Sequence, residues 1–197
     1  MTLVSAADLD AAIACLADGL SPAATTDWTT AAGTGELDAW HTAEHIGDCL
    51  LSYAAQVVSR RPSGYVPFLA ALEKDASSAD ALEFALTGSA ILAAVVRTTP
   101  PEARAYHPTG TADPAGFAAM GCAEVLVHGE DVARGLGLAL DPPREVCART
   151  MARLFRHVGD VADLDPWTAL LWATDRVEIP GRPKQTGWRW RGAPLDD

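Results

Sequence analysis

The stretch AMGCAEVLVHGEDVARGLG, residues 119–137, carries Glu124 and His128 in the middle of a run of apolar and small residues. At about 100° per residue, the two side chains project from successive turns of a helix into the same space. A carboxylate buried alone among apolar side chains is costly, so it needs a proton, a cation or hydrogen-bond donors. A divalent metal would satisfy both side chains, whereas a Glu–His hydrogen bond or a solvated stripe would need no metal.

Helical periodicity also dominates the rest of the chain, and breaks in it fall at Pro, Gly, Ser and Thr clusters. Ser5 and Asp8 predict a capping box ahead of the first helix. Further helices are expected at about Glu36 to Ser59, 66–74, Ser78 to Val96, Asp113 to Arg134 with Pro114 at the first helical position, after the prolines at 142–143, and from Pro166 to about Asp175. We therefore predict one all-α domain over residues 1–197, a helix bundle in which residues 176–197 form an arm or a small hairpin.

Composition narrows the classes of function. The formal net charge is −11, which disfavours binding to nucleic acid phosphates. The chain has no uninterrupted apolar run long enough to span a membrane, and residues 1–20 lack the basic region of a secretory signal. The four cysteines, Cys15, Cys49, Cys122 and Cys147, are not in CxxC spacing and are interpreted as reduced core thiols. These features favour a soluble cytoplasmic protein.

A second helix supplies more ligating groups. Its polar stripe consists of Asp38, His41, His45, Asp48, Cys49, Ser52, Tyr53 and Gln56. His45 together with Glu124 and His128 would make a His₂Glu set with one open position, the pattern of a catalytic zinc site. His41 lies one turn away and either faces water or takes the place of His45. Asp131, three residues after His128, either accepts a hydrogen bond from a ligand imidazole or is a surface charge near the helix end.

Two segments carry a family resemblance. LDAWHTAEHIGDCLLSYAAQ (37–56) and AAMGCAEVLVHGEDVARGLGL (118–138) resemble the mycothiol-dependent maleylpyruvate isomerase family of the DinB/YfiT-like metalloenzymes. The resemblance covers most of the chain and implies an up-down-down-up four-helix bundle. It also implies a divalent metal, commonly zinc with nickel as an alternative, held by His45, Glu124 and His128. Arg176 matches the arginine of a Gly-Arg pair that is frequent in the family.

The resemblance further implies thiol chemistry. A low-molecular-weight thiol, mycothiol or a similar cosubstrate, would attack an electrophilic substrate in S-transfer or isomerisation. On this interpretation Arg104 and Asp131 support catalysis, while Tyr53 and His107 contact the thiol. The loop that carries Arg104 and His107 is otherwise an ordinary polar loop. The alternatives are a metal-dependent hydrolase and a non-catalytic helical binding protein, and members of the family are often homodimers.

Overall fold

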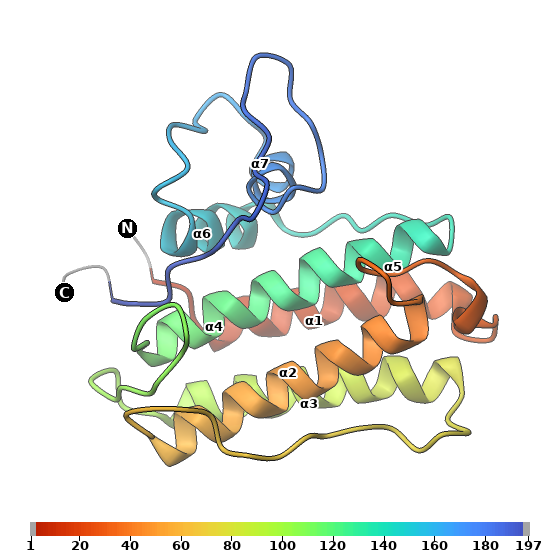
Figure 1. Ribbon diagram of the computed structural model, residues 1–197, viewed down its shortest axis with the longest axis horizontal. Helices are drawn as coiled ribbons and strands as arrows, with labels where there is room; N and C mark the ends of the chain where they lie inside the picture. Colours follow the sequence, from red (N-terminus) through yellow and green to blue (C-terminus); the bar gives the residue numbers. More distant parts are fainter. Residues whose placement is uncertain (1–2, 195–197) are drawn as a thin grey trace.

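The computed structural model describes residues 3–194 and is helical, which confirms the all-α prediction (Figure 1). The described residues contain no β-strand, only two isolated bridges. The elements are α1 (Ala6–Leu20), η1 (Ser21–Ala23), η2 (Trp28–Thr30), α2 (Ala39–Ser59), α3 (Ser78–Thr98), α4 (Pro114–Ala123), η3 (Glu124–His128), α5 (Gly129–Gly135), α6 (Arg144–Leu154) and α7 (Pro166–Ala173).

Four long helical segments pack side by side. α4, η3 and α5 follow one another without a break and form one helix over residues 114–135, which we call the α4–α5 helix. The chain runs one way along α1, returns along both α2 and α3, and runs back along the α4–α5 helix (Figure 1). α6 packs against α4, and α7 packs against α6, so these two shorter helices and the C-terminal segment lie outside the four long ones.

The predicted helix starts are largely confirmed, because the capping side chains do what their sequence positions indicate. Ser5 and Asp8 form the capping box of α1. Asp113 caps α4 and Asp165 caps α7, each followed by proline. α2 begins later than the expected Glu36, at Ala39, because the Asp38 carboxylate accepts the His41 N–H and acts as its cap.

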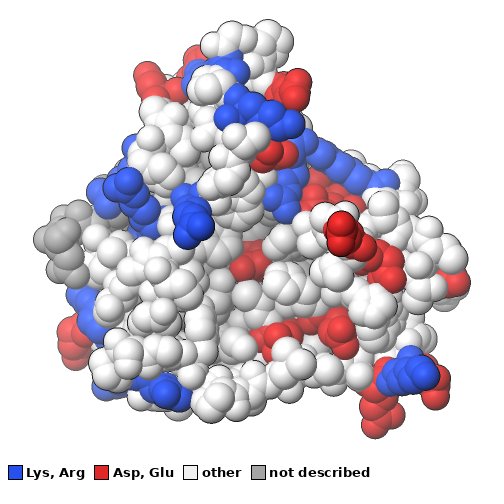
Figure 2. Space-filling model, in the orientation of Figure 1, with Lys and Arg blue, Asp and Glu red and all other residues white. Residues whose placement is uncertain are grey.

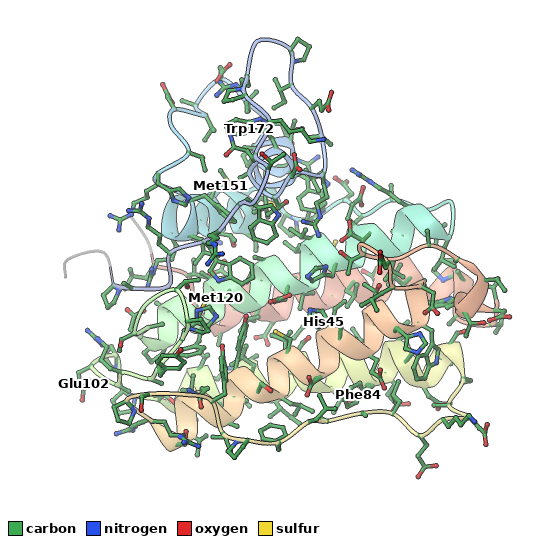
Figure 3. The ribbon with its side chains drawn as sticks, in the orientation of Figure 1. His45, Phe84, Glu102, Met120, Met151 and Trp172 are labelled. Carbon is green, nitrogen blue, oxygen red and sulfur yellow. The ribbon has the colours of Figure 1, made fainter. Side chains whose placement is uncertain are left out.

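Close packing of α2 on α3 depends on two glycines. A Cβ at Gly88 would lie 2.6 Å from the backbone oxygen of Gly47, and one at Gly47 would lie 2.3 Å from the ring of Phe84. Figure 3 labels Phe84 on α3 and His45 on α2. α3 is the one helix in residues 3–194 whose length and composition would let it cross a membrane, a test that core helices of soluble proteins also pass, and it packs against α1 and α2.

The helix predicted at 66–74 is wrong, because the chain from 60 to 77 is an irregular loop along α2. Three of its backbone N–H groups donate to side chains of α2, where a helix would pair them with its own carbonyls. Val66 N–H donates to Gln56 Oε1 at 3.0 Å, Ala70 N–H to Asp48 at 2.8 Å and Leu72 N–H to Glu44 at 2.9 Å. The loop thereby brings the chain back to the end of the bundle at which α2 began, so α3 runs parallel to α2.

The C-terminal segment forms an arm and no hairpin within its described part, residues 176–194. Arg153 on α6 is buried and binds the backbone near the end of this segment. Its guanidinium donates to Asp113 at 2.7 Å and to the backbone oxygens of Gly192 at 2.8 Å and Ala193 at 2.5 Å. This clasp ties the arm to both α6 and the start of α4.

Candidate metal centre

Three side chains of α2 face the α4–α5 helix at successive turns: His45, Cys49 and Tyr53. Spacing of four residues places them on one side of α2, which packs against η3 and α5. Figure 3 shows His45 midway along α2, where it faces that helix. The packing of α2 on the α4–α5 helix therefore presents one imidazole, one thiol and one phenol to Glu124.

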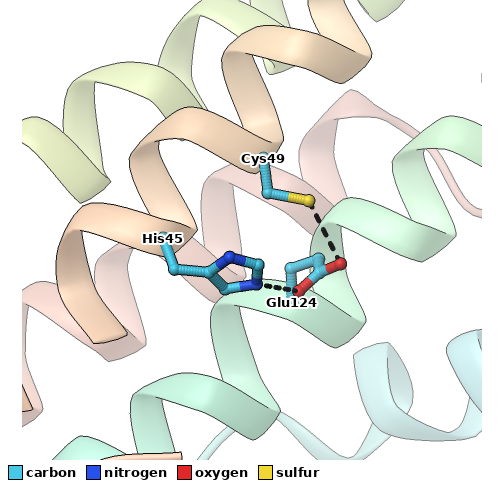
Figure 4. Close-up of side chains that lie close together, drawn as sticks. All are labelled: His45, Cys49 and Glu124. Atoms are coloured by element: carbon cyan, nitrogen blue, oxygen red, sulfur yellow. Dashed lines mark hydrogen bonds and ion pairs between the residues drawn. The ribbon is translucent and has the colours of Figure 1, made fainter. Parts of the chain in front are cut away.

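Glu124 is the centre of the site. Its side chain is 6 % exposed, and its Oε2 lies 3.0 Å from His128 Nε2 and 3.7 Å from His45 Nε2. The two imidazole rings meet edge to face, with centroids 5.1 Å apart. Figure 4 shows His45 and Cys49 approaching the carboxylate from α2. The structure thus brings together the three residues that the sequence predicted as ligands.

A π-helical turn carries two of these residues. η3 begins at Glu124 and ends at His128, between the regular helices α4 and α5. Single π turns inside α-helices are uncommon and occur frequently at functional sites. Propensity and wheel arguments assume a regular helix, so the sequence analysis did not predict this turn.

The second carboxylate oxygen of Glu124 is held by two donors from α2. Cys49 Sγ lies 3.2 Å from Oε1, and the Tyr53 hydroxyl donates to the same atom at 3.0 Å. Burial and the charge of Glu124 raise the pKa of both Cys49 and Tyr53 well above their ordinary values, so both groups keep their protons. Tyr53 is thus a partner of Glu124, and Cys49 is one as well, although the sequence analysis placed Cys49 in the polar stripe and interpreted it as a core thiol without a role at the site. The signal was its spacing of four residues from His45.

Glu124 Oε2, in contrast, is buried and has no hydrogen-bond partner among residues 3–194. The nearest nitrogens, His128 Nε2 and His45 Nε2, make ion-pair contacts with it at 3.0 and 3.7 Å. Ligand atoms of a tetrahedral metal with bonds of about 2.0–2.1 Å lie about 3.3 Å apart. The separations of 3.0 and 3.7 Å bracket that spacing. An orphaned buried carboxylate oxygen beside two imidazole nitrogens fits a divalent cation.

His128 is oriented from its far side. Its Nδ1 lies 3.3 Å from Asp131 Oδ2, and Arg176 Nη2 donates to that same oxygen at 2.9 Å. Arg176 also donates to Thr34 Oγ1 at 3.2 Å. A carboxylate on Nδ1 fixes the imidazole tautomer and leaves Nε2 for a ligand, as outer carboxylates do around metal-bound histidines.

Electrostatics make the site a balanced set of charges. Burial raises the pKa of Glu124, but His128 and His45 outweigh it and hold that pKa well below its usual range. Burial lowers the pKa of His128, but contacts with Asp131 and Glu124 raise it to about 9. Burial also raises the pKa of Asp131, but contacts with His128 and Arg176 outweigh it and lower that pKa to about 2. Without a metal, the Glu124 and Asp131 carboxylates therefore face the His128 imidazolium and the Arg176 guanidinium at neutral pH.

Other candidates from the sequence lie elsewhere. The His41 ring is half exposed and contacts Asp38 at 2.8 Å, so it serves the start of α2. Arg104 donates to the carbonyl oxygens of Pro101 and Ala103 in its own loop, a placement that does not support a catalytic role. His107 is buried, and its Nδ1 lies 2.7 Å from Thr109 Oγ1 in its own loop. Its ring also packs edge to face against the ring of Tyr53, with centroids 5.7 Å apart, so it touches the edge of the site.

A second ligand set shares two members with the predicted one. Among the described residues, the one group whose ligand atoms all lie within 4.8 Å of one another is His45, Cys49 and Glu124, and this group could hold a metal ion. Both ligand sets contain His45 and Glu124. The third member is His128 in the predicted set and Cys49 in the other. In the structure the Cys49 thiol is engaged with Oε1, the oxygen that faces away from the histidines.

Solvent reaches the site from one face. The side chain of His45 is 42 % exposed, and beside it lies a cavity of about 200 Å³ between α2 and the 60–77 loop. Glu44 and Asp48 line that cavity together with His41 and His45. Figure 2 shows acidic side chains in the hollowed middle of this face.

No family model, curated protein or solved structure matches the chain. The geometry of the site therefore carries the functional argument.

Tyr53→Phe removes the hydroxyl bond to Glu124 Oε1 and keeps the ring. We expect zinc affinity to fall by about tenfold, the lower end of the range for loss of an outer-shell partner. Titration against a fluorescent chelator measures this change. Tyr106→Phe is the control, since no side-chain hydrogen bond joins Tyr106 to the site. Equal affinities for the wild type and Tyr53→Phe would show that the hydroxyl does not support the ligand.

Zinc binding should depend on pH through His128. With a pKa of about 9, His128 carries a proton at pH 7 that must leave before Nε2 can bind a metal. Affinity should therefore rise with pH, by up to about tenfold per unit between pH 7 and 9, and level off above that pKa. Calorimetry in two buffers of different ionisation enthalpy should detect about one proton released per ion at pH 7. An affinity that is flat from pH 7 to 9 would contradict this account.

Proposed function

We propose that the protein is a divalent-metal-dependent enzyme whose ligands are His45, Glu124 and His128. The observation that carries this proposal is the buried Glu124 Oε2, which lacks a hydrogen bond and lies beside two histidine nitrogens. Without a cation, only the two nearby imidazoles offset the cost of burying this oxygen. Zinc suits the nitrogen and oxygen donors, and nickel is an alternative.

The surrounding side chains prepare the ligands. Cys49 and Tyr53 hold Oε1, which turns Oε2 toward the histidines. Asp131 holds the Nδ1 side of His128, and Arg176 fixes Asp131 in turn. Such outer contacts keep ligands in place before the cation binds, so less order has to be created on binding.

Three protein ligands leave one coordination position for a substrate atom, as in catalytic rather than structural zinc sites. When bound, the cation would lower the pKa of a thiol or water at that position and so supply a nucleophile at neutral pH. The half-exposed ring of His45 indicates the side from which a small molecule reaches this position.

We further propose that the nucleophile is a low-molecular-weight thiol and that the reaction is S-transfer or isomerisation. Support comes from the resemblance of the two ligand-bearing segments to the mycothiol-dependent maleylpyruvate isomerase family. The order of helix directions, with α2 and α3 parallel, supports a DinB-like bundle. The position of His45 on the second long helix and of Glu124 and His128 on the last one supports it as well.

A conjugation assay tests the function. Zinc-loaded protein is given mycothiol or N-acetylcysteine and 1-chloro-2,4-dinitrobenzene, so that the thiol sulfur bonds to the ring carbon while chloride and the thiol proton leave. We expect a rate that requires both metal and thiol and that falls to background in His45→Ala. His41→Ala, one turn away, is the matched control and should keep the rate within about twofold, because His41 contacts Asp38 instead.

Metal content of the same samples separates the outcomes. Loss of zinc in His41→Ala but not in His45→Ala would overturn the ligand assignment. Zinc binding with a rate that is indifferent to thiol would overturn the thiol chemistry alone.

A further inference from the structure

The cavity of about 200 Å³ between α2 and the 60–77 loop lies directly beside the proposed metal centre, because His45 forms part of its wall. The buried Glu124 Oε2, which has no hydrogen-bond partner in the described chain, lies 3.7 Å from Nε2 of the same His45. One imidazole therefore belongs both to the cavity and to the surroundings of an unpartnered carboxylate oxygen. A molecule in this cavity would be next to the centre.

Two carboxylates of α2, Glu44 and Asp48, also line the cavity. Both side chains are half-buried, and each accepts one backbone N–H of the loop. Leu72 N–H donates to Glu44 Oε1 at 2.9 Å, and Ala70 N–H donates to Asp48 Oδ1 at 2.8 Å. Neither carboxylate forms an ion pair within the described part of the chain, so the other oxygen of each remains for a ligand. Like charges four residues apart on a helix repel each other, and a bound cation would relieve that repulsion.

No lysine or arginine among the described residues lines this cavity. His41 does line it, but its ring contacts Asp38 at 2.8 Å, so any positive charge on that ring is already met by a carboxylate. The basic residues of the 60–77 loop lie outside the lining: Arg60, Arg61 and Lys74. Lys74 itself stands between two acids in the sequence, Glu73 and Asp75. The cavity therefore attracts cations and repels anions.

The remaining lining of the cavity is apolar and consists of Leu37, Leu69, Ala70 and Ala71. Leu69 is 78 % exposed, so a large apolar side chain is left open to water at the cavity. An alkyl group placed there would remove apolar surface from water. Pockets that take whole ligands have volumes of about 300–1,000 Å³, so this smaller cavity suits one end of a molecule. A short alkyl chain that ends in an ammonium group matches both the apolar and the acidic parts of the lining.

A metal ion fits the two acids less well than an organic cation does. A metal needs ligand atoms that converge on one point. Within the described chain that condition is met by His45, Cys49 and Glu124, a group to which neither Glu44 nor Asp48 belongs. An ammonium group has three rotatable donors and can bind carboxylates that do not converge.

We propose that Glu44 and Asp48 select the charge of the substrate, and that the electrophile on which the metal centre acts carries an aliphatic ammonium group that enters this cavity. This inference rests on the proposed function, because the cavity shares His45 with the proposed centre. It assigns the two acids to substrate specificity and gives them no part in the chemical step. An anionic electrophile would be repelled by both.

Methyl NMR on the wild-type chain labelled with ¹³C-leucine tests the proposal, with Leu37→Ile and Leu69→Ile to assign the two signals at the cavity. The probes are n-butylamine, which is protonated at pH 7, and 1-butanol and butyrate as neutral and anionic compounds of the same length. We expect butylamine to shift both signals saturably, with about fivefold higher affinity than butanol, because each partly exposed ion pair is weak. Butyrate should leave both signals in place.

The double variant Glu44→Gln/Asp48→Asn removes both charges, while its amide oxygens can still accept the two loop N–H groups. Its preference for butylamine over butanol should disappear. Glu102→Gln/Glu145→Gln is the matched control, because it removes two exposed charges outside the cavity and should keep the preference within about twofold. Figure 3 labels Glu102 at a distance from His45.

The wild-type titration decides the question even if the double variant does not fold. Equal affinity for butylamine and butanol in the wild type would overturn the proposal. An unchanged preference in a folded double variant would overturn it as well.

Titration of metal-free and zinc-loaded samples keeps the two proposals apart. Zinc binding without a preference for butylamine would overturn the role of the two acids and leave the metal centre standing. The preference without zinc binding would overturn the proposed enzyme and leave a site for ammonium compounds. A second zinc ion per chain that Glu44→Gln/Asp48→Asn removes would show that the cavity holds a metal, and would overturn the ammonium proposal.

Discussion

The rest of the structure depends on how one buried carboxylate is satisfied. Glu124 lies almost fully buried between α2 and the α4–α5 helix, where an unpaired charge would cost several kcal/mol, on the order of the penalty for other buried ions. Four side chains meet it: Cys49 and Tyr53 at one oxygen, His45 and His128 at the other. Because three of these come from α2, this contact ties α2 to the α4–α5 helix in one register.

Further side chains surround the groups that contact the Glu124 carboxylate. Asp131 and Arg176 fix His128, and His107 packs against Tyr53, so both sides of the site reach residues remote in sequence. The C-terminal arm closes over them because buried Arg153 binds its backbone. A change in the arm is therefore expected to reach the proposed metal ligands through packing, even though the arm contributes none of them.

The sequence predicted those features that depend on residues close together along the chain, such as helix caps and the faces of single helices. Capping residues predicted most helix starts, and the wheel placed Glu124 and His128 on one helix face, because both signals are local in the sequence. His45, on another helix, was added by the His₂Glu ligand pattern and by the family resemblance. The loop at 60–77 failed, since its hydrogen bonds go to Glu44, Asp48 and Gln56 on another element. The same limit applies to Cys49, to the π turn and to Arg104. The role of a thiol, the local winding of a helix and the direction of a long side chain all depend on partners that are distant in the sequence.

X-ray absorption at the zinc edge of the loaded wild-type protein tests the central claim most directly. Convergence of His45, Glu124 and His128 on one ion predicts only nitrogen and oxygen neighbours at about 2.0–2.2 Å, with the multiple scattering of two imidazoles. A sulfur neighbour at about 2.3 Å, which Cys49 would supply, or a signal from one imidazole only, would contradict the account.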